Sequence, residues 1–250
     1  MKKSIISLLL LSMMIPFAAC GGTASETETE TEIKTETETE AETEAETEKP
    51  EPMTISCVGD SITFGYGLDD PDKDSYPSKL KEKLGDNFTV LNFGVSGATT
   101  FRHDEHAYMN MKEYRESLKS QPDIVIIMLG TNDSVYIRNL GLSPKQFESL
   151  YERLLKSYID LESSPKVFVA TPPHAYKGRT DVEDYVKMHI QPIIKKIADK
   201  YPDVTYINMW DHTENMAKLF PDGIHPNAEG YASIADTMYS YVAEYLGINK

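Results

Sequence analysis

The sequence predicts an α/β domain in which helices cover both faces of a mainly parallel sheet. Short apolar runs alternate with segments whose apolar residues recur every three to four positions, as strands alternate with helices. The apolar run at 123–129 shows no polar alternation, which is typical of a central parallel strand buried on both faces. Polar motifs follow the first three runs, where ligands bind in such sheets. Together these observations favour a three-layer α/β/α sandwich around a flavodoxin-like, five-stranded parallel sheet.

The predicted elements alternate along the chain. The strands are expected at 54–58, 89–93, 123–129, 166–171 and 204–208. The helices are expected at about 76–84, 104–119, 144–163, 182–200 and 226–246. In the flavodoxin-like strand order 2-1-3-4-5, the first strand lies between the second and the third. The loops that follow these three neighbouring strands should therefore meet at one edge of the sheet.

Residues 1–20 have the pattern of an export signal. Two lysines precede a short apolar run that ends in small residues. Cys20 follows Phe17-Ala18-Ala19, which resembles the lipobox of bacterial lipoproteins, although Phe17 stands where that pattern usually has Leu. The resemblance implies that Cys20 is lipidated and anchors the exported protein to the bacterial membrane, with the domain on the extracytoplasmic side. An ordinary signal peptide cut nearby is the alternative.

Residues 21–52 predict a disordered, acidic tether. Thr and Glu alternate there, and residues 24–52 hold twelve glutamates against two lysines. The like charges repel and there is almost no apolar face to bury, so the segment should stay extended. The remaining residues, 53–250, are enough for one domain with a proper core.

The composition limits the partners. The formal net charge of −15 argues against nucleic acid and against binding to an anionic lipid surface. The expected partner is a small-molecule or glycan ester, with membrane contact only through the anchor and a monomer favoured. If Cys20 carries lipid, Cys57 is left alone in an apolar run as a buried free thiol, and no disulfide is expected.

Residues from four short motifs carry the chemistry. Ser61 follows the first strand, and Asp222 and His225 stand three residues apart before the last helix. A serine hydroxyl becomes a nucleophile when a base takes its proton during attack. His225 is the candidate base, and Asp222 would hold the imidazole in the required tautomer. The backbone N–H groups of Ser61 and Gly94 and the side-chain amide of Asn132 are candidate oxyanion donors.

These motifs resemble the four blocks of the SGNH (GDSL-type) hydrolases over essentially residues 53–246. The matching runs are Gly-Asp-Ser-Ile at 59–62, Asn-Phe-Gly at 92–94, Gly-Thr-Asn-Asp at 130–133 and Asp-Gly-Ile-His at 222–225. Ile62 departs from the usual Leu, and a Gly-x-Ser-x-Gly elbow is absent. The resemblance implies a serine esterase that needs no metal or other cofactor and has a shallow site.

Other polar residues have simpler interpretations. Asp60 and Asp133 are expected to be turn or helix-cap residues, and Ser96 a loop serine. His103 and His106 stand three residues apart, but no Cys or Glu-x-x-His pattern accompanies them. We therefore expect a solvated face rather than a metal site.

The loops at 134–143 and 172–181 are expected to overhang the site. They offer polar and aromatic candidates for substrate binding, namely Tyr136, Arg138, His174 and Tyr176. A lipase groove would be continuously apolar, so short acyl esters on carbohydrate, above all O-acetyl esters, fit these loops better. One alternative is a lysophospholipase or thioesterase acting on longer acyl chains. The other is a glycan-binding surface module without catalysis.

Overall fold

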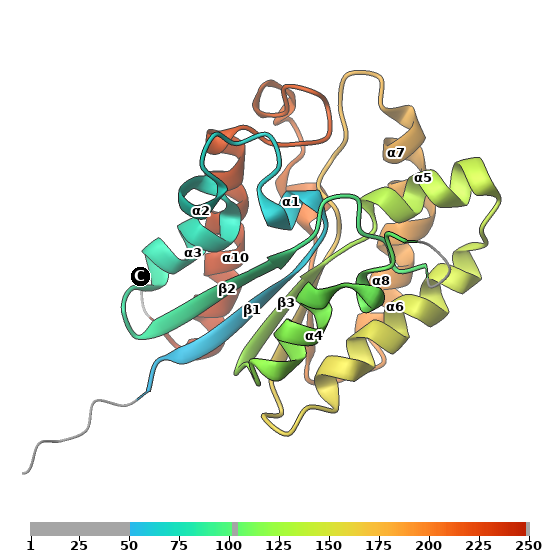
Figure 1. The fold of residues 1–250 in the computed structure, drawn as a ribbon. Coiled ribbons are helices and arrows are strands. Elements are labelled where there is room, and N and C mark those ends of the chain that lie inside the picture. The colour runs from blue at the N-terminus through green and yellow to red at the C-terminus, as the bar shows by residue number, and fades with distance from the viewer. Residues whose placement is uncertain (1–50, 102–104, 249–250) are drawn as a thin grey trace, which may run out of the picture. The chain divides into compact units, whose positions relative to one another are not determined.

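A computed structural model describes residues 51–101 and 105–248 of the chain. Its five parallel strands form one sheet in the order β2-β1-β3-β4-β5 (Figure 1). The predicted α/β fold and the flavodoxin-like strand order are therefore confirmed. The predicted signal peptide, Cys20 and nearly all of the tether lie outside the described residues. The strands are β1 (Met53–Gly59), β2 (Phe88–Gly94), β3 (Ile124–Met128), β4 (Lys166–Ala170) and β5 (Val204–Ile207).

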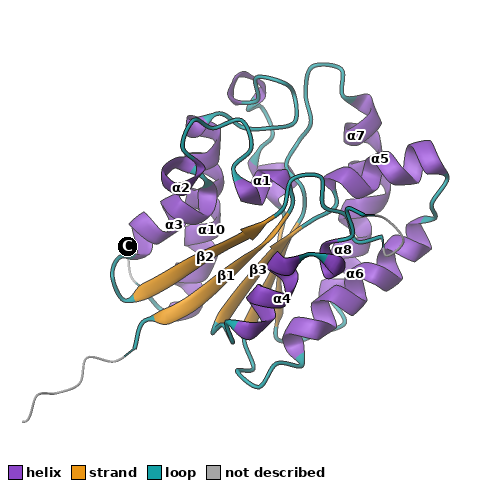
Figure 2. Cartoon of the chain, in the orientation of Figure 1, coloured by secondary structure: helices purple, strands orange, loops and turns teal. Residues whose placement is uncertain are grey.

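Helices cover both faces of the sheet (Figure 2). One face carries α3 (Tyr76–Leu84) and α10 (Ala228–Leu246), and the other carries α4 (Lys112–Lys119), α6 (Pro144–Ile159) and α8 (Gln191–Ala198). No helix of the described part has both the length and the apolar character needed to cross a bilayer. The remaining α-helices of the described residues are α1 (Ser61–Phe64), α2 (Pro71–Asp74), α5 (Thr131–Leu140), α7 (Thr180–Tyr185) and α9 (Met209–His212).

The sheet separates two hydrophobic cores. Successive side chains of a strand point to opposite faces, so Val125 and Ile127 pack in one core while Ile126 and Met128 pack in the other. All are almost fully buried, which explains why the apolar run of β3 shows no polar alternation. Cys57 lies in the second core as a buried free thiol, as predicted, and burial raises its pKa to about 12 despite an opposing hydrogen bond with Tyr76.

The prediction of a helix over 104–119 is wrong for its first half. The helix α4 begins only at Lys112, after a single 3-10 turn at Tyr108–Asn110. Thr99 exchanges backbone hydrogen bonds with the 106–108 segment, accepting from the Tyr108 N–H and donating to the His106 carbonyl. The Tyr108 hydroxyl also donates to the Phe93 carbonyl at 2.8 Å. These long-range bonds hold the segment in a loop that its local sequence pattern does not reveal.

The single helix predicted over 182–200 is interrupted. Between α7 and α8, Val186–Ile190 forms one π-helical turn, in which the Gln191 N–H donates to the Val186 carbonyl five residues earlier. Pro192 follows directly and has no N–H to continue an α-helical ladder. The wide turn accommodates the missing donor, so both halves still bury the apolar face that the sequence pattern predicted.

Candidate active site

Ser61 lies at the carboxyl end of β1, where the strand passes into α1 (Figure 1). Asp60 caps this short helix, because its Oδ1 accepts a hydrogen bond from the Ile62 N–H at 3.0 Å. Ser61 is thus the first residue of α1, and its side chain faces the loop that carries His225. The predicted cap role of Asp60 is confirmed.

The three predicted residues of the candidate triad form a continuous chain of hydrogen bonds. The Ser61 Oγ lies 2.9 Å from His225 Nε2, and His225 Nδ1 lies 2.6 Å from Asp222 Oδ2. The second carboxylate oxygen, Asp222 Oδ1, accepts from the backbone N–H groups of Ile224 and His225 at 2.8 and 2.7 Å. A turn of four residues therefore fixes the carboxylate and the imidazole relative to each other.

The hydrogen bonds around Asp222 determine its protonation state. Partial burial acts to raise the pKa of this carboxyl, but the bonds from the His225 ring and from the two backbone N–H groups outweigh it and lower the pKa to about 2. Asp222 is ionised at neutral pH. A negative charge beside Nδ1 favours the tautomer with a proton on Nδ1, which leaves Nε2 free to accept from Ser61.

The helix after His225 begins two residues later than predicted. Asn227 caps α10, with its Oδ1 accepting from the Gly230 N–H at 2.9 Å and its own N–H donating to the Leu219 carbonyl at 2.7 Å. This cap fixes the chain directly behind His225, and the long helix then anchors it against the sheet.

The three candidate oxyanion donors follow neighbouring strands, as predicted. The Ser61 N–H has no hydrogen-bond partner within 51–101 and 105–248. The Asn132 amide donates one hydrogen to the Ala98 carbonyl at 3.0 Å, which leaves its second hydrogen for a ligand. The Gly94 N–H donates to Asn92 Oδ1 at 2.9 Å, so a substrate oxygen would have to replace that side chain.

Gly94 also allows β2 to lie against α1. A Cβ at this position would stand 2.1 Å from the Phe64 backbone nitrogen, far inside contact distance. Only glycine therefore permits this approach between the end of β2 and the helix that begins with Ser61.

Asp133 is buried beside the site and is not a helix cap, in contrast to the prediction. The N-cap of α5 is Gly130, and Asp133 Oδ1 instead accepts from the Thr100 backbone N–H at 2.8 Å and from the Thr100 hydroxyl at 2.7 Å. This fixes the 98–100 segment, whose Ala98 carbonyl orients Asn132.

Asp60 and Asp133 are unusual because both are fully buried carboxyls. Burial raises the pKa of Asp60 to about 6 and that of Asp133 to about 7, against the lowering effect of their hydrogen bonds. The charge of Asp60 raises the pKa of Asp133 further. Each carboxyl also has a buried Oδ2 atom without a partner within hydrogen-bond distance in the described part of the chain.

Two of the predicted substrate-binding residues lie on a helix rather than in a loop. The segment expected as an overhanging loop at 134–143 mostly belongs to α5, which ends at Leu140 before Gly141. Tyr136 stacks on Phe101 with ring centroids 6.3 Å apart, and Arg138 is exposed. The contact of these two side chains with substrate stays a prediction.

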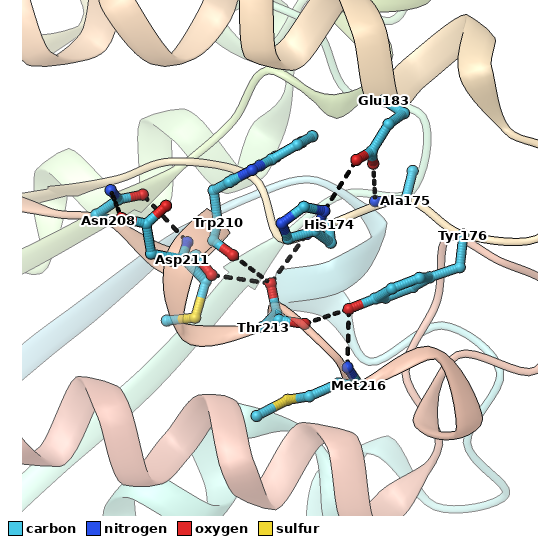
Figure 3. A network of polar contacts seen from close by, with 10 residues as sticks. His174, Ala175, Tyr176, Glu183, Asn208, Trp210, Asp211, Thr213 and Met216 are labelled. Carbon is cyan, nitrogen blue, oxygen red and sulfur yellow. Dashed lines mark hydrogen bonds and ion pairs between the residues drawn. The ribbon is translucent and has the colours of Figure 1, made fainter.

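His174 and Tyr176 take part in an internal network (Figure 3). His174 Nδ1 lies 2.9 Å from Glu183 Oε1, and its ring packs on Trp210 at 3.9 Å between centroids. The Tyr176 hydroxyl binds the Thr213 carbonyl and accepts from the Met216 N–H. Their polar atoms thus hold the loop together, and their predicted contact with substrate is not tested by this geometry.

The same loop supports the candidate triad. The Tyr176 N–H donates to the Gly223 carbonyl at 2.7 Å, between Asp222 and His225 in the sequence. Tyr176 also belongs to the network of Figure 3. Through Tyr176, this network supports one side of the turn that carries Asp222 and His225.

Tyr66 was not among the predicted site residues, although it lies directly at the site. Its ring centroid is 4.5 Å from that of His225, at an interplanar angle of 46°. The sequence signal that would have pointed to it is an aromatic residue between two glycines just after the candidate nucleophile.

Ser96 is an exposed turn residue, as predicted. His103 lies outside the described residues. The described residues contain no group of three or more His, Cys, Asp or Glu side chains that could hold a metal ion.

Comparison with protein-family models decides the family. Residues 57–233 match the GDSL-like lipase/acylhydrolase family. The chain belongs to this family. The resemblance stated from the four motifs is confirmed, and the family's description as lipases and acylhydrolases agrees with the predicted enzyme class, carboxylic ester hydrolases.

Known relatives include esterases of several kinds. An acetylxylan esterase of Xylanibacter ruminicola is 32% identical over 207 residues, which make up 75% of this chain and 42% of the relative. The chain thus spans about two fifths of that protein's length. Thioesterase 1/protease 1/lysophospholipase L1 of Escherichia coli is 26% identical over 187 residues, 74% of this chain and 81% of the relative.

A solved structure supports the fold. A carbohydrate acetylesterase family member from Sinorhizobium meliloti superposes with a TM-score of 0.63 at 22% identity, covering 78% of this chain and 100% of that one. At this identity the likeness concerns the fold alone.

Proposed function

We propose that this protein is a serine esterase that removes short acyl groups, chiefly O-acetyl groups, from carbohydrate. The observation that carries the proposal is the chain of hydrogen bonds from Ser61 through His225 to an ionised Asp222. In the proposed reaction His225 Nε2 takes the Ser61 proton as Oγ attacks the acyl carbon. The imidazolium then gives that proton to the leaving alcohol oxygen, and an acyl-enzyme remains.

Water completes the cycle in the proposed mechanism. His225 takes a proton from a water molecule, the hydroxide oxygen attacks the acyl carbon, and the Ser61 oxygen leaves with the proton from the imidazolium. During each attack the carbonyl oxygen becomes negative. The N–H groups of Ser61 and Gly94 and the free hydrogen of the Asn132 amide are proposed to stabilise it, each worth roughly 10²–10³ in rate.

The substrate class rests on two kinds of support. The relative named acetylxylan esterase matches three quarters of this chain. The loop next to the candidate triad also carries polar side chains such as His174, which pairs with Glu183 of α7, where a lipase would present a continuous apolar groove.

The test is acetate release from acetylated xylan by the full-length protein and its Ser61→Ala variant. Nitrophenyl acetate, butyrate and octanoate esters are assayed in parallel. We expect rapid release from xylan, a preference for acetate and a loss in kcat on the order of 10⁶ in the variant. Activity on long-chain esters with none on acetylated sugars would exclude a carbohydrate esterase.

A lysophospholipase or thioesterase is the second candidate. The relative that carries those names matches this chain over 81% of its own length, more than the acetylxylan esterase does. This function predicts rates that rise from acetate to octanoate. A glycan-binding module without catalysis is the third candidate, and it predicts no turnover that depends on Ser61.

We also propose that the protein is exported and lipid-anchored through Cys20, with the acidic tether between the membrane and the domain. Two acyl chains suffice for stable anchoring. Incorporation of labelled fatty acid that disappears in a Cys20→Ser variant would support this, whereas unchanged labelling would exclude Cys20 as the site.

A further inference from the structure

Tyr66 is an exposed aromatic side chain at the site. Among the described residues, the exposed large aromatic side chains are Phe64, Tyr66 and Tyr245, with exposed fractions of 44%, 50% and 51%. Of these, Tyr66 alone has a ring contact with a residue of the candidate triad in the part of the chain that the structure describes. Half of the Tyr66 side chain is thus open to a ligand that reaches the candidate triad.

The backbone around Tyr66 holds this exposed position firmly. Its N–H donates to the Ser61 carbonyl at 2.9 Å, and its carbonyl accepts from the Tyr231 hydroxyl at 3.0 Å. Gly65 and Gly67 on either side have φ angles of +95° and +86°, which other residues rarely adopt. The backbone of Tyr66 is therefore fixed relative to Ser61, and from this position its ring packs on His225.

The proposed mechanism indicates which part of the ester lies against the Tyr66 ring. The leaving alcohol oxygen must approach His225 Nε2 within hydrogen-bond distance to receive its proton. The Tyr66 ring packs on the same imidazole at 4.5 Å. The alcohol part of the ester, rather than a distant part of the substrate, is therefore the group that meets Tyr66.

We propose that Tyr66 forms an aromatic platform for the sugar ring of the leaving alcohol, and so determines the preference for carbohydrate esters. This inference rests on the proposed function. One face of a pyranose ring presents C–H groups that pack on an aromatic ring, while its hydroxyl groups keep their polar contacts. The Tyr66 hydroxyl has no hydrogen-bond partner within the described residues, so it is available to a sugar hydroxyl.

The experiment compares two acetate esters in the full-length protein. One is an acetylated xylo-oligosaccharide, and the other is ethyl acetate, whose alcohol has no ring. We expect Tyr66→Ala to lower the ratio of kcat/KM for the sugar ester to kcat/KM for ethyl acetate at least tenfold. Tyr66→Phe keeps the ring and should retain most of that ratio. Tyr245→Ala is the matched control, because Tyr245 has the same exposure and lines a hollow with Ser164 and Lys166, far from Ser61 in the fold.

A second readout measures sugar binding without chemistry. Unacetylated xylotriose should inhibit ethyl acetate hydrolysis by the wild type, and Tyr66→Ala should require roughly ten times more of it. Equal losses on both esters would mean that Tyr66 only holds His225 in place, and would overturn the platform. A loss that grows from ethyl acetate to ethyl butyrate would place Tyr66 on the acyl side and overturn it as well.

The outcomes separate this inference from the proposed function. A wild type that hydrolyses ethyl acetate but no acetylated sugar would refute the carbohydrate substrate, whatever the variants do, and the platform with it. A wild type that hydrolyses acetylated sugars, with an unchanged ratio in Tyr66→Ala, would refute the platform alone.

Discussion

Within the described part of the chain, every hydrogen bond to the Asp222 carboxylate comes from its own turn. The His225 ring binds one carboxylate oxygen, and the backbone N–H groups of Ile224 and His225 bind the other. These bonds keep the carboxylate ionised, although half of its side-chain surface is exposed. The proposed mechanism therefore depends on which nitrogen of His225 holds the proton.

Asp222→Asn should therefore impair catalysis far more than it impairs folding. The Asn carbonyl oxygen can still accept from the two backbone N–H groups, but an NH₂ group then faces Nδ1 and favours the tautomer that protonates Nε2. We expect kcat on nitrophenyl acetate to fall about 10³–10⁴-fold. The melting temperature should fall by only a few degrees, because the stabilised carboxylate charge is lost. A variant with more than a tenth of wild-type kcat would show that His225 does not need Asp222.

Residue roles near the motifs were predicted in part. The serine, aspartate and histidine were identified because their chemistry and spacing are visible in the sequence. The true partner of Asp133, Thr100, was not predicted, because a contact across 33 residues depends on how α5 packs against the 98–100 segment.

The contact between α1 and β2 depends on one residue that lacks a side chain. The end of β2 touches the backbone of α1 at Gly94, where a Cβ would stand 2.1 Å from the Phe64 nitrogen. Backbone cannot move aside as a flexible side chain can, so a methyl group there would displace the helix that carries the nucleophile.

Gly94→Ala should therefore damage both stability and activity. We expect it to lower the free energy of unfolding by about 2–4 kcal/mol and kcat at least 100-fold. Gly247→Ala is the control, since an added Cβ there meets nothing within 4 Å and only its left-handed backbone, with a φ of +67°, is unfavourable. It should cost about 1 kcal/mol with unchanged activity. Denaturant unfolding and esterase assays measure both, and equal effects of the two substitutions would contradict the contact argument.

Element boundaries were predicted where local signals determine them. The predicted helix 76–84 coincides with α3, which ends at Leu84 before Gly85. In contrast, α5 was expected to be a loop, because the Gly-Thr-Asn-Asp run suggests a turn and the helix shows little amphipathic patterning. Its tertiary packing against α7 and the first core decides that it is helical.

Across the whole molecule, buried carboxyls make stability depend on pH. Asp60 and Asp133 have pKa values of about 6 and about 7 in the folded protein, against 3.8 for an ordinary aspartate. The folded state therefore holds these protons more tightly than the unfolded state. Their contribution to stability is complete below pH 3.8 and is lost as the pH rises towards 7. Asp222, with its pKa of about 2, acts oppositely and loses its contribution as the pH falls from 3.8 to 2.

Asp133→Asn should make the stability of the protein depend less on pH between 4 and 7. The amide oxygen can still accept from Thr100, and no buried charge has to form. Between pH 4 and pH 7 the wild type should lose free energy of unfolding that the variant keeps. We expect this difference to be on the order of 2 kcal/mol. Asp86→Asn, which removes a carboxylate that is 98% exposed, is the control. Parallel pH curves for wild type and Asp133→Asn would contradict the assigned protonation.

The strand order was inferred from flavodoxin-like sheets, but the fold class and the residues of the candidate triad could be predicted directly from the chain. Each of these depends on local patterns, namely buried apolar runs and polar motifs directly after them. Only the tertiary structure placed the Tyr66 ring on His225, paired Asp133 with Thr100 and engaged the Gly94 N–H with Asn92. These contacts depend on which loops meet above the sheet and how closely they pack, and local patterns do not encode that geometry.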